Sequence, residues 1–123
     1  MILHFEAEAI EIEENEFDVL IVGFYAEENY LMIQKSLDEP DEQDVSLGMN
    51  TYHIERDDQS YGGYGGVKQI RLHNDFCEVE LDETGRQNLQ CDGIRVDFQT
   101  EPEILELLTE KLRFIFGEAL TVE

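Results

Sequence analysis

The residue types that most often carry catalysis or bind metals are few in this chain and lie far apart. His4, His53 and His73 occur in three separate segments, and the cysteines are Cys77 and Cys91. A zinc site needs His or Cys ligands that converge on the ion at characteristic spacings, and none of these residues has such a spacing. We therefore expect no catalytic residue, no metal site and no cofactor.

The segment 60–66 reads Ser-Tyr-Gly-Gly-Tyr-Gly-Gly. A phosphate-binding P-loop would continue through Lys and Ser or Thr into a helix, whereas the residues that follow here have a strand-like pattern. Glycine adopts the positive φ angles of tight turns, so we expect a hairpin loop. Tyr61 and Tyr64 would either project from this loop as rigid anchors for a protein partner or lie back on the sheet. Asp57 and Asp58, just before the loop, would add negative charge.

Negative charge dominates the composition. The chain has 30 Asp and Glu residues against 8 Lys and Arg, which gives a formal net charge of −22 in 123 residues. A field of this sign repels nucleic acids and anionic membranes, and it attracts cations and basic proteins. The same excess also suits a surface that only keeps a protein soluble, so charge alone leaves both interpretations open.

An acidic loop over residues 38–49 is the most charged local segment. It contains a proline and no apolar residue between residues 38 and 44, which is typical of a loop. It lacks the spacing of acids and glycine that an EF-hand calcium loop requires, although loosely held cations remain an alternative. Its acids are candidates for attracting a basic partner: Asp38, Glu39, Asp41, Glu42 and Asp44.

The length predicts a single domain over residues 1–123. We find no signal-peptide pattern at the start and no apolar run near the ~20 residues of a membrane span, so we expect a cytoplasmic protein that contacts neither membrane nor nucleic acid. Alternating apolar and polar residues predict strands. The strands expected from this pattern cover residues 3–13 (with a bulge), 30–36, 50–57, 67–74, 76–82 and 93–99. Residues 17–25 are apolar on both faces, which is typical of a strand covered on both sides.

The periodicity becomes helical over about residues 101–116. Thr100 and Glu103 fit a capping box, and Gly117 fits a helix stop. The pattern as a whole predicts an α+β fold: a mostly antiparallel sheet of six or seven strands with one C-terminal helix packed on one face. An open edge strand of such a sheet could pair two copies in a homodimer.

Several segments together resemble the immunity protein 10 family of bacterial polymorphic toxin systems. The resemblance rests on residues 30–35, 52–55, 58–63, 67–72, 75–81 and 93–116. It implies a small α+β protein that binds a cognate toxin in the cytoplasm and protects the producing cell, with no active-site residues to carry over. That the toxin is a basic nuclease domain, whose substrate groove an acidic inhibitor could occupy, is an inference from charge alone.

The leading hypothesis is therefore a non-enzymatic immunity protein that blocks its toxin by occlusion. The candidate partner-binding residues are Asp38, Glu39, Asp41, Glu42, Asp44, Asp57, Asp58, Tyr61 and Tyr64. The alternative is an acidic small-ligand or cation-binding module with no toxin partner. An enzyme would need a convergent polar pocket, and the sequence predicts none.

Overall fold

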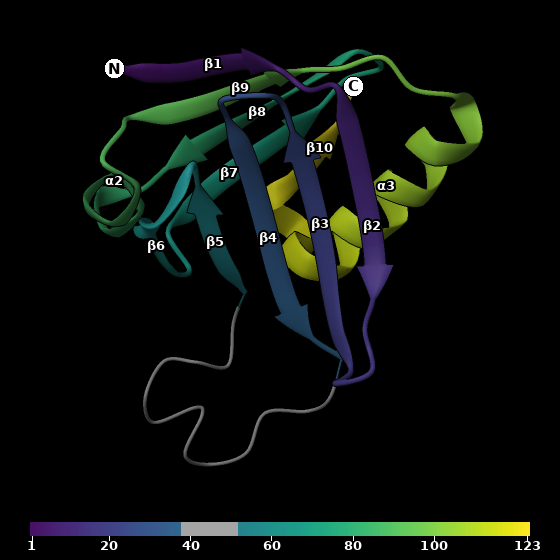
Figure 1. The fold of residues 1–123 in the computed structure, drawn as a ribbon, viewed down its shortest axis with the longest axis horizontal. Helices are drawn as coiled ribbons and strands as arrows, with labels where there is room; N and C mark the ends of the chain where they lie inside the picture. The colour runs from purple at the N-terminus through teal and green to yellow at the C-terminus, as the bar shows by residue number, and fades with distance from the viewer. Residues whose placement is uncertain (38–51) are drawn as a thin grey trace.

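The computed structural model describes residues 1–37 and 52–123, and these form two five-stranded sheets whose strands run in clearly different directions (Figure 1). Sheet A has the order β1 (Ile2–Glu6), β9 (Gly93–Asp97), β8 (Phe76–Leu81), β7 (Val67–Leu72) and β10 (Leu120–Val122). Sheet B has the order β2 (Ala9–Glu14), β3 (Val19–Tyr25), β4 (Tyr30–Ser36), β5 (His53–Arg56) and β6 (Asp58–Tyr64). The helices are α2 (Glu83–Leu89), α3 (Pro102–Phe116) and the short 3₁₀ turn η1 (Gly117–Ala119).

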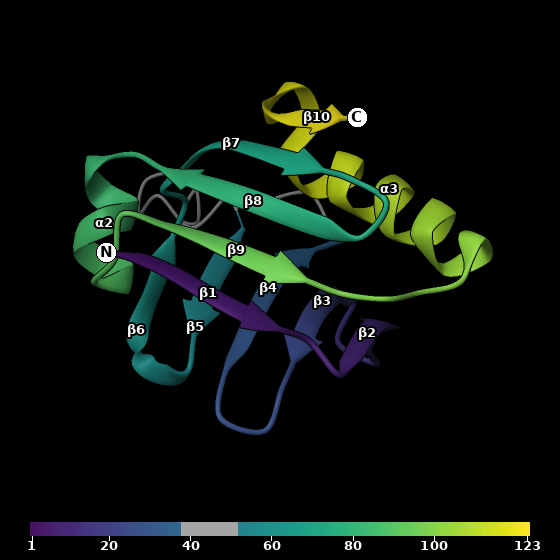
Figure 2. The same cartoon turned by 90° about the horizontal axis from the view of Figure 1, so that it is seen from above.

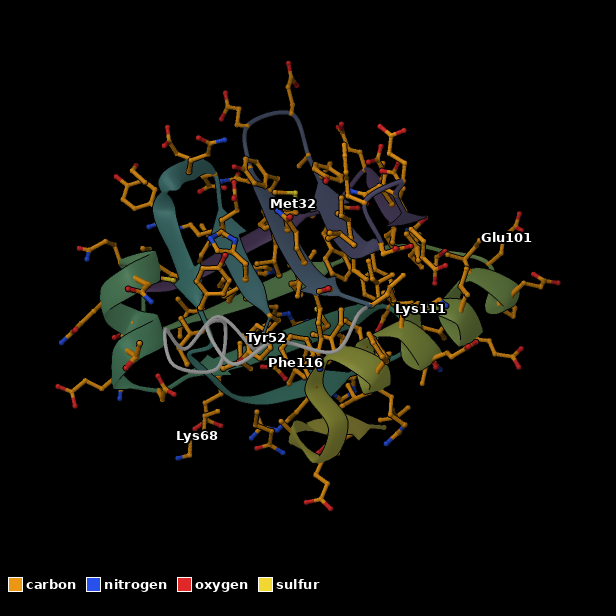
Figure 3. The ribbon with its side chains drawn as sticks, turned by 90° about the horizontal axis from the view of Figure 1, so that it is seen from below. Met32, Tyr52, Lys68, Glu101, Lys111 and Phe116 are labelled. Atoms are coloured by element: carbon orange, nitrogen blue, oxygen red, sulfur yellow. The ribbon has the colours of Figure 1, made fainter. Side chains whose placement is uncertain are left out.

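One core joins the inner faces of the two sheets. Side chains alternate between the two faces of a strand, and on each sheet the apolar set points inward. α3 lies at one end of the sheets and α2 at the other (Figure 2). Tyr52 and Phe116 lie together between sheet B and α3, with ring centroids 4.7 Å apart (Figure 3). Fully buried members of this core include Leu20, Val22, Phe24, Leu31, Ile33, Ile70, Ile94, Val96, Leu108 and Leu112.

The predicted α+β class is confirmed, but the single sheet of six or seven strands is wrong. Residues 3–13 do not form one bulged strand. The change of phase between Ala9 and Ile10 accompanies the passage of the chain from sheet A, where β1 pairs with β9, to sheet B, where β2 pairs with β3. Ala7 is buried at this crossing. A phase change in an alternating pattern is compatible with both a bulge and a change of sheet.

The predicted hairpin loop over residues 60–66 is also wrong. These residues lie mostly in β6, which pairs antiparallel with β5. The hairpin turn comes earlier, at Asp57, whose φ is +63°. Consequently the segments 50–57 and 67–74 are not partners, because β5 belongs to sheet B and β7 to sheet A.

The glycines allow close packing against α2. Asp82 begins this helix by accepting a hydrogen bond from the Gly85 amide at 2.9 Å, as N-cap aspartates do. A Cβ on Gly63 would lie 2.2 Å from Nδ2 of Asn88, and a Cβ on Gly85 would lie 2.2 Å from the carbonyl oxygen of Gly66. Side chains at these positions would hold α2 away from β6.

The C-terminal helix lies where its periodicity places it. α3 covers Pro102–Phe116, with Pro102 at its start and Gly117 at its end in a positive-φ conformation of 56°. The cap residue is Glu101 and not Thr100, and it makes no side-chain cap hydrogen bond. The capping-box prediction is therefore wrong, while the apolar stripe of the helix is buried as expected: Leu108, Leu112, Ile115 and Phe116.

The contact between Gly85 and Gly66 predicts a specific stability effect. Gly85→Ala should lower the free energy of unfolding by about 1–3 kcal/mol, because the new methyl group meets rigid backbone. Thr84→Ala, at the exposed neighbouring position, should change it little. Urea unfolding of both variants measures the difference, and equal midpoints would contradict the close approach of α2.

Candidate protein-binding face

The structure describes only some of the partner-binding residues predicted from the sequence. Asp38, Glu39, Asp41, Glu42 and Asp44 lie outside the described residues, so their role stays a prediction. Asp57, Asp58, Tyr61 and Tyr64 lie in or beside β6, at the edge of sheet B.

Asp57 stabilises the fold from within. Its carboxylate accepts hydrogen bonds from the amide of Tyr30 at 3.0 Å and from Nδ2 of Asn29 at 3.2 Å. It also forms an ion pair with Arg56 at 3.1 Å. These contacts tie the β5–β6 turn to the neighbouring start of β4, so most of this carboxylate is already engaged. Asp58 differs: it is exposed, and it accepts hydrogen bonds from Ser60, which lower the pKa of its carboxyl group.

Tyr61 and Tyr64 lie on opposite sides of β6. Tyr64 is opposite His53 in the register, and their rings meet edge to face with centroids 5.1 Å apart. Tyr61 instead lies under the guanidinium of Arg56, 4.2 Å from the ring centroid, on the side where Arg56 donates to the Leu89 carbonyl of α2. The two tyrosines therefore cannot both contact one flat partner surface.

Tyr64 belongs to a larger surface, the outer face of sheet B, which no described element covers. This face is turned to the viewer in Figure 1, and Figure 3 shows Met32 on the side of the sheet away from α3. Antiparallel partners directly opposite each other share a face, so the register defines the surface. From β3 to β6 it comprises Ile21, Gly23, Tyr25, Tyr30, Met32, Gln34, His53, Glu55, Gly62 and Tyr64.

Aromatic rings form one half of this face. The ring of Tyr25 lies across Gly23, where an added Cβ would fall 2.3–2.4 Å from its ring atoms and hydroxyl. Tyr30 stacks beside Tyr25 with centroids 6.1 Å apart. Rigid aromatic side chains of this kind are enriched in protein interfaces. Residues 17–25 were predicted to be covered on both sides. The described residues cover them on one side only.

Glu55 occupies the centre of the face and is the buried charged residue of the described core, with 6 % of its surface exposed. Its Oε2 accepts a hydrogen bond of 2.5 Å from the Tyr30 hydroxyl, and its Oε1 lies 3.9 Å from Nδ1 of His53. Burial, together with this hydrogen bond to Glu55, raises the pKa of Tyr30. The phenol therefore stays protonated and keeps donating to the carboxylate.

The outer face of sheet B carries carboxylates and, at its described positions, no Lys or Arg. Glu11 and Glu13 flank it on β2, opposite Gly23 and Ile21. The neighbouring cationic side chains form hydrogen bonds away from this face. Arg56 donates to the Leu89 carbonyl at 2.8 Å, and Lys35 donates to the Phe114 carbonyl at 3.4 Å. The face therefore combines aromatic and apolar side chains with a net negative charge.

The outer face of sheet A has the opposite character, because its charges pair with each other. Arg71 lies 3.4 Å from Glu80, and Arg95 lies 3.1 Å from Asp97. An open hollow of about 220 Å³ lies between these two arginines, which is below the roughly 300–1,000 Å³ of typical ligand pockets. The hollow is therefore smaller than a typical ligand pocket, and each of these two arginines is paired with a carboxylate.

The described residues give little support for a metal site, a membrane-spanning helix or a reactive cysteine. Within residues 1–37 and 52–123, no group of three or more His, Cys, Asp or Glu is placed to hold a metal ion. No helix in the same ranges is long and apolar enough to cross a membrane. Burial raises the pKa of the Cys77 thiol to about 12, which makes it a poor nucleophile.

The family model that matches this chain is that of immunity protein 10, over residues 6–106. The chain belongs to the immunity protein 10 family. The match covers all of sheet B, the three inner strands of sheet A, α2 and the start of α3, and so includes the outer face of sheet B. Neither a curated protein nor a solved structure matches the chain.

Asp57 and Asp58 differ in their contacts, so substitutions at the two positions should affect stability differently. Asp57→Ala should lower the free energy of unfolding by about 1–3 kcal/mol, because it removes an acceptor from the Tyr30 amide and places alanine at a positive φ. Asp57→Asn, which tolerates this φ and keeps an acceptor, should cost clearly less. Asp58→Ala should unfold close to the wild type. If Asp58→Ala were less stable than Asp57→Ala, the structural role assigned to Asp57 would be contradicted.

Proposed function

We propose that this chain is an immunity protein that neutralises a cognate bacterial toxin by binding and occluding it. The observation that carries this proposal is the match of the immunity protein 10 family over residues 6–106. The protein would act by binding and not by catalysis.

The net charge of −22 supports a basic partner. Charges of one sign speed the encounter with a surface of the opposite sign and discourage other acidic proteins. A toxin domain with a basic substrate groove, as nucleases have, would meet this requirement. The acids of residues 38–44 and the exposed Asp58 would act at this stage, because their part is attraction over a distance.

The rival cation-binding function has its strongest sequence signal in residues 38–44, which lie outside the described residues. Pairing of two copies through an edge strand stays a proposal too. The described edges are β1 and β10 of sheet A and β2 and β6 of sheet B. Analytical ultracentrifugation of the free protein would reveal such a dimer.

Co-expression with a candidate toxin domain from the same locus tests the function. The toxin alone should stop growth, and the immunity protein should restore it and elute with the toxin as one complex from a sizing column. A chain from an unrelated immunity family serves as the control for expression load. Growth that is not restored, together with no complex, would end the proposal.

The steering role of the acids has its own measurement. Replacing Asp38, Glu39, Asp41, Glu42 and Asp44 by their amides should slow association with the toxin, because encounter rates depend on the field of the whole surface. The slope of the association rate constant against salt concentration should become shallower. Stopped-flow mixing at several salt concentrations provides both values, and an unchanged rate constant would remove this role from these residues.

A further inference from the structure

The outer face of sheet B combines two features that rarely occur together in a free protein. It presents apolar and aromatic side chains, of which Tyr25, Tyr30 and Met32 are only half-buried. In the middle of these side chains lies Glu55, a buried carboxylate whose described partners are a phenol and an imidazole and no Lys or Arg. Burying a charge is costly unless an opposite charge or several hydrogen bonds compensate for it.

We propose that this face is the toxin-docking surface and that a Lys or Arg side chain of the toxin binds at Glu55. The proposal rests on the proposed function, since it names the surface by which that function is carried out. Two ionised oxygens can accept about four hydrogen bonds, and Tyr30 supplies one. A carboxylate in a mostly dry setting binds a guanidinium or ammonium group more strongly than one in water does.

The residues beside Glu55 on the two neighbouring strands are small or flexible. Gly62 lies directly opposite Glu55 on β6, and a Cβ there would be 2.8 Å from the Cβ of Glu55. Met32 lies opposite on the other side, from β4. Methionine is flexible and adapts to an incoming surface, while the tyrosines supply rigid contact area around it. Such an arrangement of a central anchor with an apolar surround is typical of interface hot spots.

Charge decides between the occupants of this face. A second copy of the chain carries the same net charge of −22 and would be repelled. The outer face of sheet A, which holds Arg71 and Arg95, has already paired these cations with Glu80 and Asp97. The acidic segment 38–44 has the same sign as Glu11, Glu13 and Glu55. A basic partner protein is the occupant that complements the face.

Four variants in two matched pairs test the surface. Glu55→Gln removes one charge from the proposed site with little change in shape, and Glu78→Gln makes the same change on the outer face of sheet A. Met32→Lys places a cation beside Glu55, and Gln69→Lys places one beside Glu80 on sheet A. Within each pair the net charge of the molecule changes equally, so long-range attraction is the same.

Binding of each variant to a catalytically inactivated form of the same candidate toxin domain is measured by calorimetry. Glu55→Gln and Met32→Lys should weaken binding about 10-fold to 100-fold, as loss of a desolvated charge pair does. Glu78→Gln and Gln69→Lys should stay within about threefold of the wild type, as expected for charges outside the interface. Met32→Lys should also unfold at the same urea concentration as the wild type or higher, because the new ammonium group pairs with Glu55. Weaker binding without weaker folding is a signature that a purely structural role of this face would not give.

The outcomes separate the two proposals. If the wild type binds the toxin and all four variants bind equally well, the docking surface is wrong and the immunity function stands. If the sheet A variants lose affinity and the sheet B variants do not, the partner docks on the other face. If the wild type neither binds nor protects, the proposed function fails, and this inference fails with it.

Discussion

The contact between the inner faces of the two sheets is the interaction on which the rest of the structure depends. Side chains such as Phe24, Ile33, Ile70 and Val96 meet there without solvent, and each contributes about 1.5–3 kcal/mol by its burial. Because a strand has only two faces, this packing also determines which residues point outward. On sheet A the outward set consists largely of charged pairs. On sheet B it includes Ile21, Tyr25, Tyr30 and Met32, which a sheet exposed only to water would not need.

Local patterns in the sequence predicted most strands and the long helix. Clean alternation located β8 and β9, and the helical period of the leucines located α3. The failures share one physical cause: contacts between distant segments decided the outcome. Four glycines favour a loop when only their neighbours are considered. In the structure Gly62 and Gly63 lie in the edge strand β6 and Gly65 and Gly66 follow it, and Asn88 and Gly85 of α2 pack directly against Gly63 and Gly66. No pattern within residues 60–66 reveals the helix that arrives twenty residues later.

The proposed docking face could not be predicted from the sequence for a related reason. Tyr25, Met32 and Glu55 come from three strands, and only the register between β3, β4 and β5 brings them together. One sequence signal did point to this face. Residues 17–25 are apolar on both sides, which predicts a second cover, and the described chain supplies only one. Tyr64 is exposed on this face, whereas the carboxylate of Asp57 stabilises a turn.

The acids alone do not make one face of the molecule more negative than another, because 30 carboxylates lie along the whole chain. The positions of the few cations create this difference. Lys68 and Arg71 pair with Glu80, Arg95 pairs with Asp97, and Lys111 reaches from α3 to Glu14 at the end of β2. Each pairing neutralises negative charge at its own position, and none of these lies at the centre of sheet B. The repulsion left among Glu11, Glu13 and Glu55 is a cost that the free protein bears. In the proposed complex a cationic partner would remove that cost, so the same charges that weaken the isolated fold would strengthen the complex and favour basic proteins.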